Sequence, residues 1–194
     1  VSEIGLGCWA LGGLNTKNGH DSGWAPVNPS EAEEAVALAL EKGVNHFDNA
    51  DVYGDGRAEI LLADILDRLG ENNEDFIISS KVGFHSDGPE HAYTPENIRS
   101  QCEKSLRNLK RDYIDIYYLH HGDFGKDDRY LEPAAAMMRK LQKEGKIRLI
   151  GQSAHKTSQF EKAVPVLKPT VLQSWAHMMD TKFIVENGLA GQLL

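Results

Sequence analysis

The chain has few cysteines and no long apolar run. Its 194 residues include only two cysteines, Cys8 and Cys102, and they do not form a CxxC pair. This scarcity excludes a disulfide-stapled fold and fits a reducing compartment, so we expect a cytoplasmic location. The longest apolar stretches are much shorter than the ~18 residues of a membrane span. No basic region followed by an apolar segment opens the chain, so no signal peptide is expected.

Positive charge is also in short supply. Lysine and arginine number 21 and aspartate and glutamate 29, which gives a formal net charge of −8 at pH 7. No basic run is interleaved with aromatic residues, and this argues against a nucleic-acid partner and against docking on an anionic membrane. With 41% hydrophobic and 26% charged residues, the chain has the composition of a globular domain with one sizeable core.

Short apolar runs alternate with helical patterns along the chain. The expected strands cover residues 4–9, 44–49, 75–81, 113–120, 147–153 and 170–174. The expected helices begin at Ser30, Ala58, Thr94, Leu131 and Ser158, and the tail from Phe183 to Leu194 resembles the start of another. Serine followed three residues later by glutamate predicts capping boxes at Ser30 and Ser158. Thr94 followed by Pro95 predicts an N-cap and a first helical position.

This β-α alternation predicts a parallel sheet with helices outside it. A doubly wound dinucleotide-binding fold should carry G-x-G-x-x-G after its first strand, and the Gly5-Leu6-Gly7 stretch lacks the third glycine. Polar residues instead follow the strand ends, where (β/α)8 barrels carry their chemistry. These residues are Asp48, Lys81, His120, Ser153 and Gln173.

The sequence therefore predicts an α/β fold of the (β/α)8 TIM-barrel type. About six of the eight strand-helix units are visible, and residues 1–194 are interpreted as a single partial barrel domain. A sheet of six strands leaves unpaired edges and apolar faces. We therefore expect either a further C-terminal segment or an oligomeric partner to cover the open barrel.

Four residues at neighbouring strand ends suit one reaction type. Asp48, Lys81 and His120 end three consecutive strands, and Tyr53 follows Asp48 by five residues. A tyrosine hydroxyl, with a pKa of ~10, is a weak acid unless a nearby cation lowers that value. Lys81 can supply the cation, Asp48 can orient it, and His120 can hydrogen-bond the same substrate oxygen. The set suits protonation of an oxygen that gains negative charge, as in carbonyl reduction by hydride.

The motifs around these residues resemble those of the aldo-keto reductase family. The resemblance rests on Gly5 to Trp9, Asp48 to Gly54 with Ala58-Glu59, Ile78 to Lys81, Ile114 to His120 and Gly145 to Ser153, in this order along nearly the whole chain. It implies a barrel enzyme that reduces an aldehyde or ketone with NADPH, a small-molecule carbonyl substrate and a catalytic set of Tyr53, Asp48, Lys81 and His120. Cofactor contacts are implied at Asp48, Ser153, Gln173 and Trp9.

The sequence departs from the family pattern at two places that bear on the cofactor. Ala154 stands where many members carry asparagine, which puts one hydrogen bond to the nicotinamide carboxamide in doubt. The segments that follow the seventh and eighth strands of the family, and hold the cofactor phosphates, have no counterpart here. We therefore expect these 194 residues alone to bind NADPH weakly.

Other interpretations remain open at this point. Lys81, Asp48 and Tyr53 taken singly also fit a surface lysine, a loop cap and a half-buried aromatic residue. A non-catalytic relative acting as a regulatory or channel-associated subunit is the main alternative. An aldolase-like barrel with a Schiff base on Lys81 is disfavoured, because a lysine beside Asp48 stays protonated. No metal site is expected, since His120 and His121 are adjacent in a strand and point to opposite faces.

Overall fold

The computed structural model describes residues 1–17, 20–84 and 91–175. Its main sheet has the order β1-β4-β5-β6-β7-β8. These strands are Leu6–Gly7 (β1), His46–Asp48 (β4), Ile77–Val82 (β5), Ile114–Leu119 (β6), Ile147–Ala154 (β7) and Val171–Ser174 (β8). All neighbouring strands in this sheet pair in parallel, as the β-α alternation predicts.

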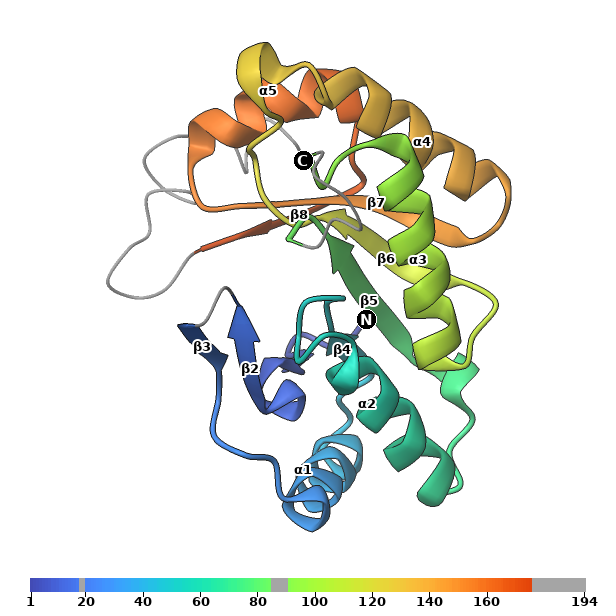
Figure 1. The fold of residues 1–194 in the computed structure, drawn as a ribbon. Coiled ribbons are helices and arrows are strands. Elements are labelled where there is room, and N and C mark those ends of the chain that lie inside the picture. The colour runs from blue at the N-terminus through green and yellow to red at the C-terminus, as the bar shows by residue number, and fades with distance from the viewer. Residues whose placement is uncertain (18–19, 85–90, 176–194) are drawn as a thin grey trace.

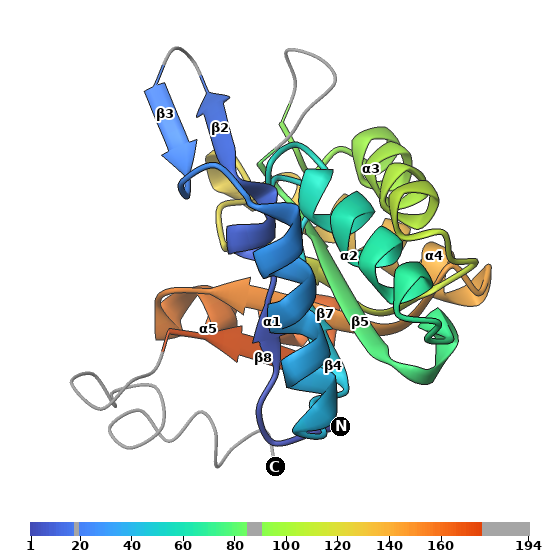
Figure 2. The same ribbon diagram turned by 90° about the horizontal axis from the view of Figure 1, so that it is seen from below.

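Five α-helices connect the strands and lie on the outside of the curved sheet (Figure 1). They are Pro29–Glu41 (α1), Arg57–Arg68 (α2), Pro95–Leu109 (α3), Leu131–Lys143 (α4) and Thr157–Leu167 (α5). Three short 3₁₀ turns cover Trp9–Gly12, Asn73–Asp75 and Lys126–Asp128. The strand direction turns through the sheet, so that β7 and β8 run across β5 in Figure 2, as expected for a strongly twisted parallel sheet.

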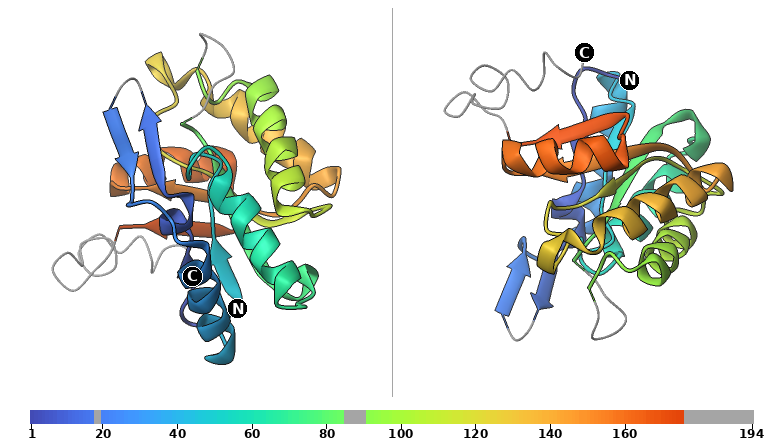
Figure 3. Two further views of the ribbon diagram at one scale, coloured as in Figure 1. Left: turned by 60° about the horizontal axis from the view of Figure 1, so that its bottom comes forward. Right: turned by 90° about the horizontal axis from the view of Figure 1, so that it is seen from above.

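The two faces of the sheet differ in chemistry. Side chains that alternate toward the helices belong to the main hydrophobic core, among them Phe47, Ile78, Val82, Tyr117, Leu119 and Ile150. The opposite face carries Ser79, Lys81, Tyr118, Ser153 and Gln173 at paired positions of β5 to β8. The core between sheet and helices thus stabilises the fold, while the concave face is left for a polar site. The curvature of this face is visible in Figure 3.

An ion-pair network joins strands β5, β6 and β7. The buried carboxylate of Asp115 pairs with Arg111 at 3.0 Å and with Arg148 at 3.1 Å, and it accepts a hydrogen bond from the Ile78 amide at 3.0 Å. Both guanidinium groups also lie against the ring of Tyr113, at 4.5 Å and 3.7 Å from its centroid. Because one carboxylate holds three neighbours, this network fixes the register of the strands that carry the site.

An antiparallel hairpin that the sequence patterns do not predict stands out from the barrel layers (Figure 2). Its strands are Leu14–Lys17 (β2) and His20–Gly23 (β3). Polar contacts tie its base to the turn after β4 and to the start of α2: Arg57 donates to the carbonyl oxygens of Gly12, at 3.2 Å, and Leu14. Asn15 donates to the Val52 carbonyl at 3.2 Å. These bonds fix the base of the hairpin against that part of the chain.

The helix starts differ in part from their predicted caps. Thr94 caps α3 as expected. Helix α1 is capped by Asn28, whose side chain accepts from the Ser30 amide, so the prediction of Ser30 as N-cap is wrong. Pro29 suits the first helical position and the Asn28 carboxamide oxygen reaches the Ser30 amide, so the helix begins before Ser30. Helix α5 begins at Thr157, so Ser158 is not its cap either. The helix expected at 183–194 lies outside the described residues.

Candidate active site

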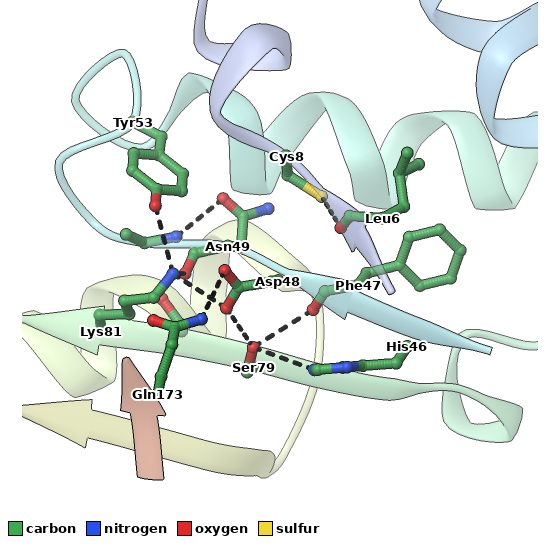
Figure 4. Close-up of polar contacts among 12 residues, drawn as sticks. Leu6, Cys8, His46, Phe47, Asp48, Asn49, Tyr53, Ser79, Lys81 and Gln173 are labelled. Carbon is green, nitrogen blue, oxygen red and sulfur yellow. Dashed lines mark hydrogen bonds and ion pairs between the residues drawn. The ribbon is translucent and has the colours of Figure 1, made fainter. Parts of the chain in front are cut away.

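A buried ion pair lies at the carboxyl ends of β4 and β5 (Figure 4). The Lys81 ammonium nitrogen is 2.9 Å from Asp48 Oδ1, and only 1% of the Lys81 side chain is exposed. The same ammonium group donates to the Asn49 carbonyl oxygen at 2.7 Å. Asp48 accepts further bonds from the Ser79 hydroxyl at 2.8 Å and from Gln173 Nε2 at 3.0 Å. The predicted pairing of Lys81 with Asp48 is present, and bonds to Asn49, Ser79 and Gln173 fix its geometry.

Tyr53 completes this arrangement from the turn between β4 and α2. Its hydroxyl lies 3.2 Å from Lys81 Nζ, and its ring stacks on Trp9 at a centroid distance of 6.0 Å. Burial raises the pKa of Tyr53, and the positive charge of Lys81 opposes that shift. The Lys81 charge lowers the Tyr53 pKa in the direction that the sequence predicts, but burial has the larger effect. The phenol is thus protonated at neutral pH and holds a proton that it can donate.

His120 faces the same space from the residue after β6. Its ring meets that of Tyr53 edge to face at a centroid distance of 6.0 Å. Burial, and then the Lys81 charge, lowers its pKa well below 6.5, so the imidazole is neutral at pH 7. His121 is turned away, toward Gly83 and Tyr93, and its Nε2 lies 2.6 Å from the Gly83 carbonyl oxygen. The expected division between the two histidines is therefore present.

These groups border a cavity of about 690 Å³. Its lining includes Trp9, Asn15, Asp48, Tyr53, Phe84, His120, Ser153, Gln173 and Trp175. The lining therefore includes six of the seven candidate site residues, and the seventh, Lys81, reaches the cavity through its contact with Tyr53. Trp9, Phe84 and Trp175 are large, partly exposed aromatic residues at this cavity. Such a volume with aromatic walls and a few convergent polar groups has the properties of a small-molecule site.

Residues implied as cofactor contacts also lie at the cavity. Ser153 and Gln173 are register partners on β7 and β8. Gln173 Nε2 is already bonded to Asp48, so its Oε1 remains to accept a hydrogen bond from a ligand amide. Trp9 stacks on Tyr53 and packs edge to face against Trp24 at 5.6 Å. None of these contacts identifies a ligand, so their roles remain a prediction.

Some polar partners escaped the sequence patterns. Ser79 donates a hydrogen bond to Asp48, yet a serine inside an apolar strand gives no distinctive sequence signal.

Two further buried groups lie near the site. Cys8 is fully buried, and burial together with the negative charge of Asp48 raises the pKa of its thiol, so the thiol stays protonated. Glu59 is fully buried although its sequence position in the first turn of α2 is typical of an exposed helix-start glutamate. Only the two-residue period of β5, with Ser80 facing the helices, could have indicated a partner for Glu59.

Across the described ranges, no group of three or more histidine, cysteine, aspartate or glutamate side chains could hold a metal ion. Within the same ranges, no helix is both long enough and apolar enough to cross a membrane. Parallel strands, outer helices and polar groups at the carboxyl strand ends define part of a (β/α)8 barrel with a site at its catalytic face.

The chain belongs to the aldo/keto reductase family, whose model matches residues 3–190. It is 31% identical over 151 residues to L-galactose dehydrogenase of Arabidopsis thaliana, an alignment that covers 78% of this chain and 44% of the relative. It is also 31% identical over 124 residues to a probable voltage-gated potassium channel subunit beta of that plant, over 63% of this chain and 34% of the relative.

The fold matches a solved aldo-keto reductase of Klebsiella pneumoniae in complex with NADPH. The TM-score is 0.63 at 28% identity, over 83% of this chain and 48% of that one. The family resemblance and the partial (β/α)8 barrel expected from the sequence are thus confirmed. The chain spans about half the length of the curated relatives it matches, from 44% to 47% for the first three.

Proposed function

We propose that the complete protein reduces an aldehyde or ketone to an alcohol with NADPH, and that Tyr53 is the general acid. The observation that carries this proposal is the Tyr53 hydroxyl, which borders the cavity and lies 3.2 Å from the buried Lys81 ammonium group. A protonated phenol beside a fixed cation suits a substrate oxygen that becomes negatively charged as hydride arrives at the carbonyl carbon.

The cavity wall fits a nicotinamide ring. Gln173 Oε1 and the Ser153 hydroxyl offer an acceptor and a donor for its carboxamide, and both residues lie on the wall formed by β7 and β8. The similarity to a reductase solved with NADPH supports the choice of cofactor. When bound, the reduced cofactor supplies the hydride.

The protein's own residues divide the remaining work. Tyr53 donates its proton to the substrate oxygen, and Lys81 stabilises the phenolate that this transfer leaves behind. Asp48 orients the ammonium group through the 2.9 Å ion pair. His120, neutral at pH 7, donates a hydrogen bond to the same substrate oxygen. A ligand bound between the aromatic residues would displace water from the cavity, which would strengthen each of these electrostatic interactions.

The test measures NADPH oxidation by the complete protein across a panel of aldehydes and ketones. Tyr53→Phe should lower turnover by ~10²–10⁴-fold and leave NADPH binding nearly unchanged, since the hydroxyl acts where charge develops. Tyr113→Phe is a matched control, because its ring lies away from the cavity against Arg111 and Arg148. A Tyr53→Phe protein with more than about a tenth of wild-type turnover would contradict the acid role.

A second candidate function rests on the relative named as a channel beta subunit. In this alternative the barrel binds NADPH and a partner protein without turning over a carbonyl substrate. Tight NADPH binding with no oxidation across the whole substrate panel would favour it. Turnover that Tyr53→Phe abolishes would favour the reductase.

A further inference from the structure

Directly behind the ion pair, on the opposite side of the sheet, lies a layer of buried polar side chains. Ser80 lies between Ser79 and Lys81 on β5, so its side chain faces the helices while the side chains of Ser79 and Lys81 face the site. Glu59 of α2 reaches it there, and both residues are fully buried. A buried carboxylate is costly unless it is hydrogen-bonded, so the partners of Glu59 decide whether it is tolerated there.

Glu59 holds three elements together. One carboxylate oxygen accepts from the Ser80 hydroxyl of β5 at 2.6 Å, and the other accepts from Asn108 Nδ2 of α3 at 2.8 Å. Gly56, just before α2, has a φ of 85°, and a Cβ there would lie 2.5 Å from Asn108 Nδ2. No room for a Cβ remains between Gly56 and Asn108, so the start of α2 packs directly against this side chain.

The other end of the turn that carries Tyr53 is held by backbone bonds to β5. The Asn49 amide donates to the Ser79 carbonyl at 3.0 Å, and the Asp51 amide to the Lys81 carbonyl at 3.2 Å. At the helix end, the Ala58 amide donates to the Tyr53 carbonyl at 3.2 Å. Residues 49–58 are thus held at both ends. Backbone bonds to β5 hold the first end, and the hydrogen bond between Glu59 and Ser80 holds the end at α2.

Asp51 adds a second carboxyl group to the same layer. It is almost fully buried, and burial followed by the charge of Glu59 raises its pKa well above the usual range. Burial also raises the pKa of Glu59, and the hydrogen bonds from Ser80 and Asn108 oppose that shift. Both carboxyl groups therefore depend on hydrogen bonds and on each other within this layer.

We propose that Glu59 is a positioning residue for the reduction proposed above: its bonds to Ser80 and Asn108 set α2 against β5 and so hold the Tyr53 hydroxyl next to Lys81. It touches neither substrate nor cofactor and acts through Tyr53. The inference rests on the proposed function for its kinetic consequences. Its structural consequence, a fixed turn at residues 49–58, stands independently of activity.

The experiment compares Glu59→Ala, Glu59→Gln and Ser80→Ala in the complete protein with Glu132→Ala, an exposed glutamate in the first turn of α4. Glu59→Ala should lower kcat by about tenfold or more, because small misplacements of a reacting group are expensive, while the KM for NADPH changes little. Glu59→Gln should recover most of the loss, since its amide oxygen can still accept from Ser80. Amide hydrogen exchange over residues 50–57 should quicken in Glu59→Ala while α4 keeps its protection.

Each result decides the inference. A Glu59→Ala protein with wild-type kcat, alongside an inactive Tyr53→Phe, would overturn the positioning role and leave the reductase function intact. If the wild type reduces no carbonyl compound, the reductase proposal fails, and exchange alone decides: unchanged exchange over residues 50–57 overturns the role of Glu59. If Glu59→Ala does not fold, Ser80→Ala removes one of its two bonds and provides the same readouts.

Discussion

Gly12 and Gly54 meet backbone to backbone: a Cβ on Gly12 would lie 2.7 Å from the Gly54 amide nitrogen and 2.7 Å from the Tyr53 carbonyl carbon. Neither neighbour is a flexible side-chain end that could move aside. The base of the hairpin β2–β3 therefore rests on the turn that presents the Tyr53 hydroxyl to the cavity, with no room for a methyl group between them.

Gly12→Ala should destabilise the protein by about 1–3 kcal/mol, the usual cost of forcing an extra carbon into a packed contact. It should also lower turnover, because the displaced backbone carries Tyr53. Urea unfolding and NADPH oxidation measure the two effects. Gly7→Ala is the control, since nothing lies within 4 Å of a Cβ at that position. Equal stability of the two variants would contradict the close contact.

Lys81→Met and Tyr53→Phe should not act independently. Lys81 contributes through the hydroxyl that lies 3.2 Å away, so its removal matters little once that hydroxyl is gone. We expect the double variant to have about the turnover of the more severe single variant. Lys162→Met, which breaks an exposed pair with Asp128, should leave turnover unchanged. If the fold-loss of turnover in the double variant equals the product of the two single losses, the two residues act separately.

Asp115→Ala should cost about 3–5 kcal/mol of unfolding free energy, because it leaves the buried Arg111 guanidinium without its carboxylate partner. Chemical denaturation of the variant measures this loss. Asp112→Ala, which truncates an exposed carboxylate just before β6, should be nearly neutral. A loss below about 1 kcal/mol for Asp115→Ala would mean that the network stabilises the sheet little.

The free energy of unfolding should fall as the pH decreases below about 6.5. Burial is the main cause of a lowered pKa at four histidines, His46, His91, His120 and His121. Below pH 6.5 these side chains bind protons in the unfolded chain but less readily in the folded protein, so protonation favours unfolding. His120→Gln should make this fall shallower, because it removes one buried imidazole whose pKa is lowered. Denaturation curves at pH 5 and pH 7 provide the comparison. Identical slopes for His120→Gln and the wild type would contradict the burial effect.

Hydrophobic periodicity was enough to predict most barrel elements of the described chain, because each buries one face in a single core. It could not reveal the hairpin, since Leu14–Lys17 and His20–Gly23 are mostly polar and have no apolar alternation. The positions of Asp48, Lys81 and His120 were predictable from their places at strand ends. The bond between Gln173 and Asp48 was not, because it spans 125 residues and depends on the curvature of the sheet.

All three tryptophans of the chain lie at or next to the candidate active-site cavity. Trp9 and Trp175 line the cavity, and Trp24 packs against Trp9. The intrinsic tryptophan fluorescence of the described part of the chain therefore originates entirely from side chains at or next to the cavity. A ligand that enters it and absorbs at the wavelengths where indole emits will quench that light, so occupancy can be followed by fluorescence titration without a dye and without turnover.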